Sequence, residues 1–141
     1  MTVYAETSAV LAWLLGEPSG SRVVDFLRPP SRVVVSDLTL IECDRTLLRL
    51  ARKRPDSLTD TITLRTRLAA VGAGWAVEPI ADRVVDRARA PFPDDAIRSL
   101  DAIHLATAVV VRASIGEIDV LSLDERIRTN AASLGFRVLP D

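Results

Sequence analysis

The sequence predicts a three-layer α/β/α fold built around a central, mostly parallel sheet of about four to five strands. Short stretches rich in β-branched residues alternate along the chain with segments of helical periodicity. The segments that join successive strands are about a dozen residues or longer, as helical crossovers between parallel strands require. No linker, internal repeat or low-complexity segment interrupts the 141 residues, so we expect a single domain over residues 1–141.

The first half of the chain is predicted to contain two buried strands, each followed by helices. Thr7 or Ser8 can cap the helix after the first strand, and Gly16 ends that helix. The middle of the second strand is entirely β-branched, and Ser36 or Asp37 can cap the long helix after it. In order, we expect a strand at 2–6, helices at 9–15 and 19–27, a strand at 32–36, a helix at 38–53, a break at 55–57 and a helix at 58–71.

The second half of the chain is predicted to contribute shorter strands separated by further helices. Pro79 lacks a backbone donor, which places the third strand at an edge of the sheet. Gly116 and Gly135 are expected to end the helices that precede the last two strands, and Asp124 or Ser122 can open the helix between those strands. In order, we expect a strand at 75–79, helices at 80–90 and 99–112, a strand at 119–122, a helix at 125–134 and a strand at 136–139.

The helix predicted at 99–112 combines an apolar surface with a carboxylate. Its side chains, Leu100 included, leave almost no polar face, which indicates that the helix is buried. Asp101 nevertheless lies in its first turn, and His104 lies one turn later on the same face. Because a carboxylate is rarely buried without a partner, we expect Asp101 to meet a counter-charge or a metal ion.

Composition narrows the classes of function. A net charge of −1 provides no overall basic field, so a polyanionic ligand would have to be held by local patches or by metal. The single cysteine, Cys43, excludes an internal disulfide and a cysteine-rich zinc site and is expected in the core. We find no signal-peptide pattern and no apolar run long enough to span a membrane, so a cytoplasmic location is expected.

Four carboxylates are predicted to converge at one edge of the sheet. Glu6 ends the first strand, Asp124 follows the fourth, and Glu42 and Asp101 lie near the starts of helices that face the same edge. Asp119 lies at the start of the fourth strand, at the opposite edge of the sheet, so we prefer Asp124 as the fourth carboxylate of the site. Ionised carboxylates this close need a counter-charge, which Mg²⁺ or Mn²⁺ supplies. The expected reaction is metal-assisted hydrolysis of a nucleic-acid phosphodiester.

At these positions the sequence resembles a known family. The stretches 3–10, 36–43, 100–106 and 121–124 look like the four motifs of PIN-domain nucleases, and the length and motif order are similar to the VapC toxins of toxin–antitoxin pairs. The resemblance implies a PIN-like fold and a Mg²⁺- or Mn²⁺-dependent endoribonuclease. It also implies a homodimer and a cognate VapB-like antitoxin, one segment of which occupies the acidic groove.

The motif match assigns roles to individual residues. By resemblance, Glu42, Asp101 and Asp124 fall on the family's metal-site carboxylates. Thr7 or Ser8 falls on the hydroxyl position beside the first carboxylate. We interpret His104 as a packing residue or as a residue that contacts the metal ligands without binding the metal, since a hard-cation nuclease site needs no histidine.

The first motif departs from the family pattern, because Glu6 stands where the family normally has aspartate. Glutamate keeps the charge but extends the carboxylate by about 1.5 Å and adds a rotatable bond, which loosens a site built for octahedral Mg²⁺. We expect Glu6 to remain a ligand, directly or through water. The alternative is a catalytically weakened PIN domain that binds RNA or antitoxin without efficient cleavage.

Basic side chains near the carboxylates are candidates for phosphate contacts. The flank that contains Arg45 and Arg49 is interpreted as an ordinary solvated helix face. The alternative is that these two arginines hold RNA phosphates, as Arg126 and Arg128 could. Two other folds are disfavoured. A phospho-receiver domain would by resemblance carry a lysine on a late strand, whereas the only lysine, Lys53, lies on an early helix. A dinucleotide-binding fold would need a Gly-x-Gly-x-x-Gly pattern after the first strand, and none is present.

Overall fold

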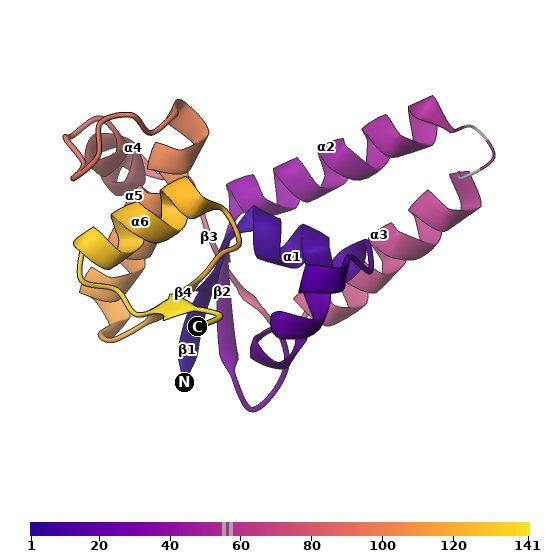
Figure 1. Ribbon diagram of the computed structural model, residues 1–141, viewed down its shortest axis with the longest axis horizontal. Coiled ribbons are helices and arrows are strands. Elements are labelled where there is room, and N and C mark those ends of the chain that lie inside the picture. The colour runs from indigo at the N-terminus through magenta and orange to yellow at the C-terminus, as the bar shows by residue number, and fades with distance from the viewer. Residues whose placement is uncertain (55, 57) are drawn as a thin grey trace.

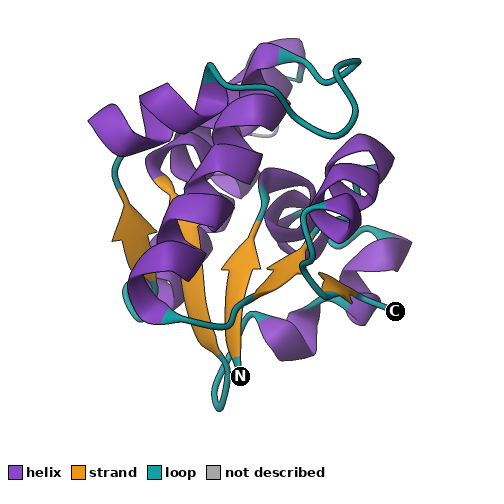
Figure 2. Cartoon of the chain, turned by 90° about the vertical axis from the view of Figure 1, so that its left-hand side faces the viewer, coloured by secondary structure: helices purple, strands orange, loops and turns teal. Residues whose placement is uncertain are grey.

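The computed structural model describes residues 1–54, 56 and 58–141, and within that part a five-stranded sheet forms the centre of the molecule. Every neighbouring pair of strands is parallel, in the order β3-β2-β1-β4-β5. Figure 2 shows the strands side by side with helices around them. The strands are β1 (Thr2–Ala5), β2 (Arg32–Ser36), β3 (Ala76–Glu78), β4 (Asp119–Leu121) and β5 (Val138–Leu139). The predicted parallel sheet is confirmed, with β3 at an edge.

Helices cover both faces of the sheet, which confirms the three layers. Side chains of the first three helices pack on one face of the sheet and those of the last three on the other. Figure 1 shows the two sets of helices on either side of the strands. The helices are α1 (Thr7–Leu14), α2 (Asp37–Lys53), α3 (Leu58–Gly72), α4 (Asp82–Ala88), α5 (Ser99–Ile115) and α6 (Glu125–Ser133). Among the described residues no helix is both long and apolar enough to cross a membrane.

Successive side chains of β1 point to opposite faces of the sheet and therefore belong to two different hydrophobic cores. Val3 and Ala5 belong to the core beneath α1, α2 and α3, whereas Tyr4 belongs to the core beneath α4, α5 and α6. Val34 faces the same way as Tyr4 in the neighbouring strand. Tyr4 therefore lies directly under the N-terminal half of α5.

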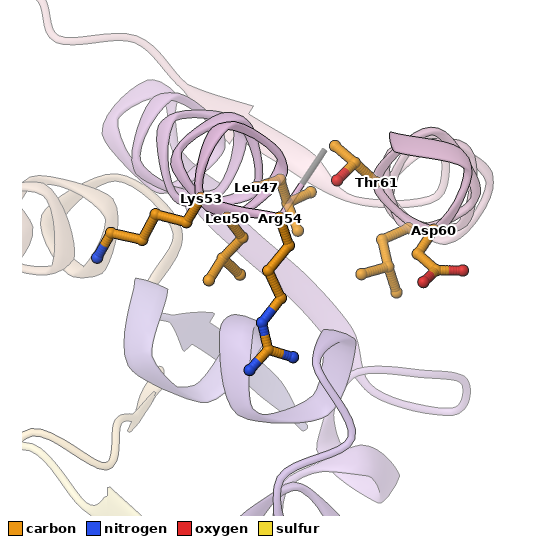
Figure 3. A pocket seen from close by; sticks show the side chains of 7 residues that line it. Leu47, Leu50, Lys53, Arg54, Asp60 and Thr61 are labelled. Atoms are coloured by element: carbon orange, nitrogen blue, oxygen red, sulfur yellow. The ribbon is translucent and has the colours of Figure 1, made fainter. Parts of the chain in front are cut away.

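The hairpin of α2 and α3 extends beyond the sheet as an arm, and Figure 1 shows its two helices side by side. Of the chain break predicted at 55–57, residues 55 and 57 lie outside the described part. A hollow of about 450 Å³ lies between the C-terminal part of α2 and the N-terminal part of α3. Figure 3 shows Leu47, Leu50 and Lys53 on the α2 side of this hollow, and Thr61 on the α3 side.

Three expectations about local structure are wrong. The segment predicted as a helix at 19–27 forms two short 3₁₀ helices, η1 (Pro18–Arg22) and η2 (Val24–Phe26), because Gly20 disfavours a continuous α-helix. The N-cap of α1 is Glu6, not Thr7 or Ser8, which lie inside the helix. Leu100 is 48% exposed, because it lies in the first turn of α5, where the helix leaves the core.

Candidate active site

The carboxyl ends of β1 and β4 meet at the edge where the acidic residues were expected. The backbone N–H of Glu6 donates to the carbonyl of Leu121 at 3.0 Å, which brings the last residues of the two strands together. Ser122 follows β4 and is fully buried. The side chains that follow these two strands are therefore held at one place by backbone pairing alone.

Glu6 is a buried carboxylate that accepts hydrogen bonds through one oxygen. Its Oε2 accepts from the backbone N–H of Ser8 at 3.0 Å, from the Ser8 hydroxyl, and from the Ser122 hydroxyl at 2.8 Å. The Ser122 hydroxyl in turn accepts from the backbone N–H of Asp124 at 3.1 Å. Glu6 thus caps α1 and also joins α1 to the loop after β4.

Glu42, on α2, lies in a second group of hydrogen bonds with residues of α1 and α5. Its Oε1 accepts from the Thr7 hydroxyl at 2.7 Å and from His104 Nε2 at 2.6 Å. The two groups adjoin each other, since Glu6 Oε1 lies 3.8 Å from the same His104 nitrogen. The structure therefore brings Glu6, Thr7, Glu42 and His104 together, although only the first two are adjacent in the sequence.

These contacts alter the pKa of Glu42. Burial by itself would raise the pKa of this carboxyl, but hydrogen bonds from His104 and Thr7 oppose the effect of burial, and the pKa of Glu42 lies below its ordinary value. Glu42 is therefore held ionised. The neighbouring Cys43 behaves oppositely: burial, then the charges of Glu42, Asp44 and Glu6, raise the pKa of its thiol to about 12. Cys43 is a core residue, as predicted, and not a nucleophile.

Asp101 and Asp124 lie at the starts of α5 and α6 and have Arg126 in common. Oδ2 of Asp101 accepts from the backbone N–H of Arg98 at 3.2 Å, and lies 4.0 Å from Nη1 of Arg126. Oδ1 of Asp124 accepts from the backbone N–H groups of Arg126 and Ile127 at 2.9 and 3.2 Å. Both carboxylates therefore cap their helices, and Arg126 lies between them.

The predicted ligands thus form two pairs in this structure. Glu6 and Glu42 approach His104, and Asp101 and Asp124 approach Arg126. In the described part of the chain, no three histidine, cysteine, aspartate or glutamate side chains are close enough together to form a ready metal site. The expected convergence of all four carboxylates is therefore seen pairwise only.

The chemistry of this donor set fits a hard divalent cation. All four predicted ligands are carboxylates, and each uses one oxygen for the hydrogen bonds described above. The second oxygens of Glu42, Asp101 and Asp124 accept no hydrogen bond from the described residues. Carboxylate oxygens of this kind suit Mg²⁺ or Mn²⁺ better than a soft metal.

A hollow of about 440 Å³ opens beside Glu42, and its lining mixes charge with apolar surface. Glu42 and Thr7, which are hydrogen-bonded to each other, line one part of the hollow. The rest of the lining includes Arg45 and Arg49 from the exposed side of α2 and Leu100 from the first turn of α5. The two arginines on α2 that are candidates for phosphate contacts therefore lie beside Glu42. The third, Arg126, lies instead beside Asp101. A polyanion seated in the hollow would meet guanidinium groups next to carboxylates.

Two residues of this region were not predicted from the sequence. The Tyr4 hydroxyl lies 2.8 Å from His104 Nδ1, and Ser122 supports Glu6. Tyr4 carried a usable signal, because a buried tyrosine needs a partner for its hydroxyl. Ser122 carried none, since a serine after a strand is common in any loop.

Comparisons with known proteins agree with this architecture. The model of the PIN domain family matches residues 3–133. Ribonuclease VapC35 of Mycobacterium tuberculosis (strain ATCC 25618 / H37Rv) is 29% identical over 139 residues, which cover 97% of this chain and 95% of that protein. Ribonuclease VapC46 of the same strain is 29% identical over 143 residues, with the same coverage.

Two solved structures share the fold. A chain in the crystal structure of VapBC2 from Rickettsia felis bound to a DNA fragment from their promoter superposes with a TM-score of 0.64 at 8% identity, covering 98% of this chain and 97% of that chain. PAE2754 from Pyrobaculum aerophilum superposes with a TM-score of 0.58 at 18% identity, covering 92% and 84%. At these identities the similarity concerns the fold alone.

Proposed function

The chain belongs to the PIN domain family, and from this premise we propose that it is a metal-dependent endoribonuclease, the toxin of a toxin–antitoxin pair. Two relatives that align over nearly the whole chain bear the name ribonuclease. The observation that carries the proposal is the arrangement of Glu42, which is held ionised beside Arg45 and Arg49 in one hollow. Carboxylates next to guanidinium groups suit metal-assisted hydrolysis of a phosphodiester.

The four carboxylates Glu6, Glu42, Asp101 and Asp124 would hold one or two Mg²⁺ or Mn²⁺ ions. A bound ion of this kind supplies a polarised phosphate and an activated water. The protein's own contribution is positioning. Thr7 and His104 hold one oxygen of Glu42 and leave its other oxygen unengaged among the described residues. The arginines Arg45, Arg49 and Arg126 would hold RNA phosphates on either side of the carboxylates.

The same proposal includes partners and location. We expect a homodimer in the cytoplasm, formed by a single PIN domain over residues 1–141, and a VapB-like antitoxin. An antitoxin segment in the acidic groove would compete with RNA for Arg45 and Arg49. Apolar side chains exposed along α2, among them Ile41 at 52%, support a partner of this kind, because they would be covered in a complex.

The hydrogen bonds of Glu6 favour a second candidate function. Three donors, from Ser8 and Ser122, use a single oxygen of this carboxylate, which gives Glu6 a structural role as a cap and cross-link. A PIN domain whose first carboxylate is committed in this way would bind RNA or antitoxin and cleave slowly. The two candidates differ in turnover and agree in binding.

The test is incubation of the purified protein with a total RNA pool in the presence of Mg²⁺ or Mn²⁺. The leading proposal expects cleavage that a chelator abolishes and that Asp101→Ala reduces at least about 100-fold. The matched control is Asp119→Ala, since Asp119 opens β4 at the opposite edge of the sheet. Undiminished cleavage by Asp101→Ala would refute the assigned site. Binding without cleavage in the wild-type protein would favour the second candidate.

A further inference from the structure

The one tyrosine and the one histidine of the chain are in contact beneath the candidate site. The Tyr4 hydroxyl lies 2.8 Å from Nδ1 of His104, and the two rings meet edge to face with their centroids 6.2 Å apart. Tyr4 is 1% exposed and His104 is 2% exposed. Strand β1 and helix α5 supply the two residues, so the contact joins the sheet to the helix that carries Asp101.

The hydrogen bond of the other ring nitrogen, Nε2, determines which group donates in the contact between Tyr4 and His104. Nε2 lies 2.6 Å from Oε1 of Glu42. Because an ionised carboxylate only accepts hydrogen bonds, Nε2 has to carry a proton and donate it. In a neutral imidazole Nδ1 then has a lone pair, which needs a donor in this buried place. The hydroxyl of Tyr4 is the donor at that distance.

We propose that Tyr4 is a positioning residue for the candidate site: its hydroxyl donates to Nδ1 of His104, fixes the imidazole as the Nε2–H tautomer and thereby holds Glu42 in place. Burial, together with the charges of Glu6 and Glu42, raises the pKa of Tyr4 far above its ordinary value, so the hydroxyl keeps the proton it donates. The inference rests on the proposed function only for the part that Glu42 plays as a ligand.

Removal of the hydroxyl has a defined consequence. In Tyr4→Phe the aromatic ring still fills the core, but Nδ1 loses its donor. The lone pair of Nδ1 is then buried without a donor, and any turn of the ring or shift of the proton that relieves this weakens the hydrogen bond from Nε2 to Glu42. Loss of a residue that hydrogen-bonds to a metal ligand and orients it typically weakens metal binding by about 10–100-fold.

The first test is NMR of the imidazole nitrogens of the metal-free protein at pH 8. Because the chain has a single histidine, the signal is assigned without ambiguity. The wild-type protein is expected to show the Nε2–H tautomer with a hydrogen-bonded Nδ1, and Tyr4→Phe a shifted Nδ1 resonance, as expected for a lone pair that has lost its donor. The control is Thr61→Val, which removes a buried hydroxyl from α3. A wild-type imidazole that is doubly protonated or carries its proton on Nδ1 would overturn the proposal, as would an unchanged spectrum in Tyr4→Phe. The wild-type spectrum decides the matter even if Tyr4→Phe does not fold.

The second test measures Mn²⁺ affinity by calorimetry. Tyr4→Phe is expected to bind Mn²⁺ at least about 10-fold more weakly than the wild type, and Thr61→Val within about twofold. Equal affinity in Tyr4→Phe would overturn the positioning role. If the wild-type protein binds no Mn²⁺, the metal-dependent part of the proposed function fails, and the NMR result still decides whether Tyr4 fixes the tautomer of His104. The two failures are therefore distinguishable.

Discussion

Nε2 of His104 and Oε1 of Glu42 lie 2.6 Å apart, although 62 positions separate the two residues in the sequence. The contact joins the second turns of α2 and α5, which pack on opposite faces of the sheet. It crosses from one layer to the other at the carboxyl ends of the strands. The same contact that holds a candidate ligand therefore also contributes to the stability of the fold, and the first prediction uses this coupling.

We predict that the stabilisation due to Glu42 is lost at acidic pH. The pKa of Glu42 is lower in the folded protein than its ordinary value of 4.5, so the unfolded chain binds the proton more readily. The stabilisation is then complete above pH 4.5 and is lost as the pH falls through the lower pKa of the folded state. The free-energy difference between the wild type and Glu42→Gln should be constant near neutral pH and should narrow below pH 4.5.

Urea unfolding between pH 7 and pH 3 measures this difference. Other carboxylates titrate in both proteins, so their effects largely cancel. The control is Glu17→Gln, since Glu17 is exposed and makes no side-chain cap contact in η1. A Glu42→Gln difference that stays constant, or that widens on acidification, would contradict the lowered pKa of Glu42.

We also predict that Glu6→Asp lowers stability. Shortening the side chain withdraws the carboxylate by about 1.5 Å from the hydroxyls of Ser8 and Ser122, which it now joins. Weakening these buried, charge-assisted bonds should cost about 1–3 kcal/mol. Urea unfolding measures the loss, and Glu17→Asp is the matched control at an exposed site. An unchanged stability would show that the cap and cross-link contribute little.

The same variant separates the two candidate functions. If Glu6 serves as a ligand despite its length, the cleavage rate of Glu6→Asp should stay within about tenfold of the wild-type rate. A much larger increase in rate would show that the glutamate limits catalysis, as the second candidate requires. The comparison needs equal fractions of folded protein, which the unfolding curves provide.

Most of the fold could be predicted because its signals are local. The β-branched strands, the long helical crossovers and the glycines that end helices each depend on neighbouring residues only. The site could be predicted in outline, because strand ends in a parallel sheet share one edge. The contact of Tyr4 with His104 could not, since a pairing across 100 positions follows from which face of β1 meets α5. The exposure of Leu100 was missed for a similar reason: an apolar helix does not reveal where it leaves the core.

A fourth prediction concerns Gly20 in η1. A Cβ added there would lie 2.4 Å from the backbone carbonyl oxygen of Ala12, a distance that no rotation of a side chain relieves. Gly20→Ala should therefore force η1 away from α1 and lower the free energy of unfolding by about 2 kcal/mol or more. Gly72→Ala is the control, because its added Cβ would make an ordinary contact at 3.6 Å with Trp75. A Gly20→Ala protein as stable as Gly72→Ala would contradict the close approach.

The last prediction tests the basic side of the hollow that contains Glu42. Arg45 and Arg49 are exposed on α2 and line this hollow, so each is expected to contact one RNA phosphate. Arg45→Gln and Arg49→Gln should each weaken binding of single-stranded RNA, measured with a chelator present so that cleavage does not interfere. Neutralising one phosphate contact lowers the slope of log K against log salt by about 0.7 for a single strand. Arg89→Gln is the matched control, since Arg89 is an exposed arginine after α4 on the other side of the sheet. If all three variants change affinity and slope alike, the RNA is held by overall charge, and the hollow beside Glu42 is not its binding site.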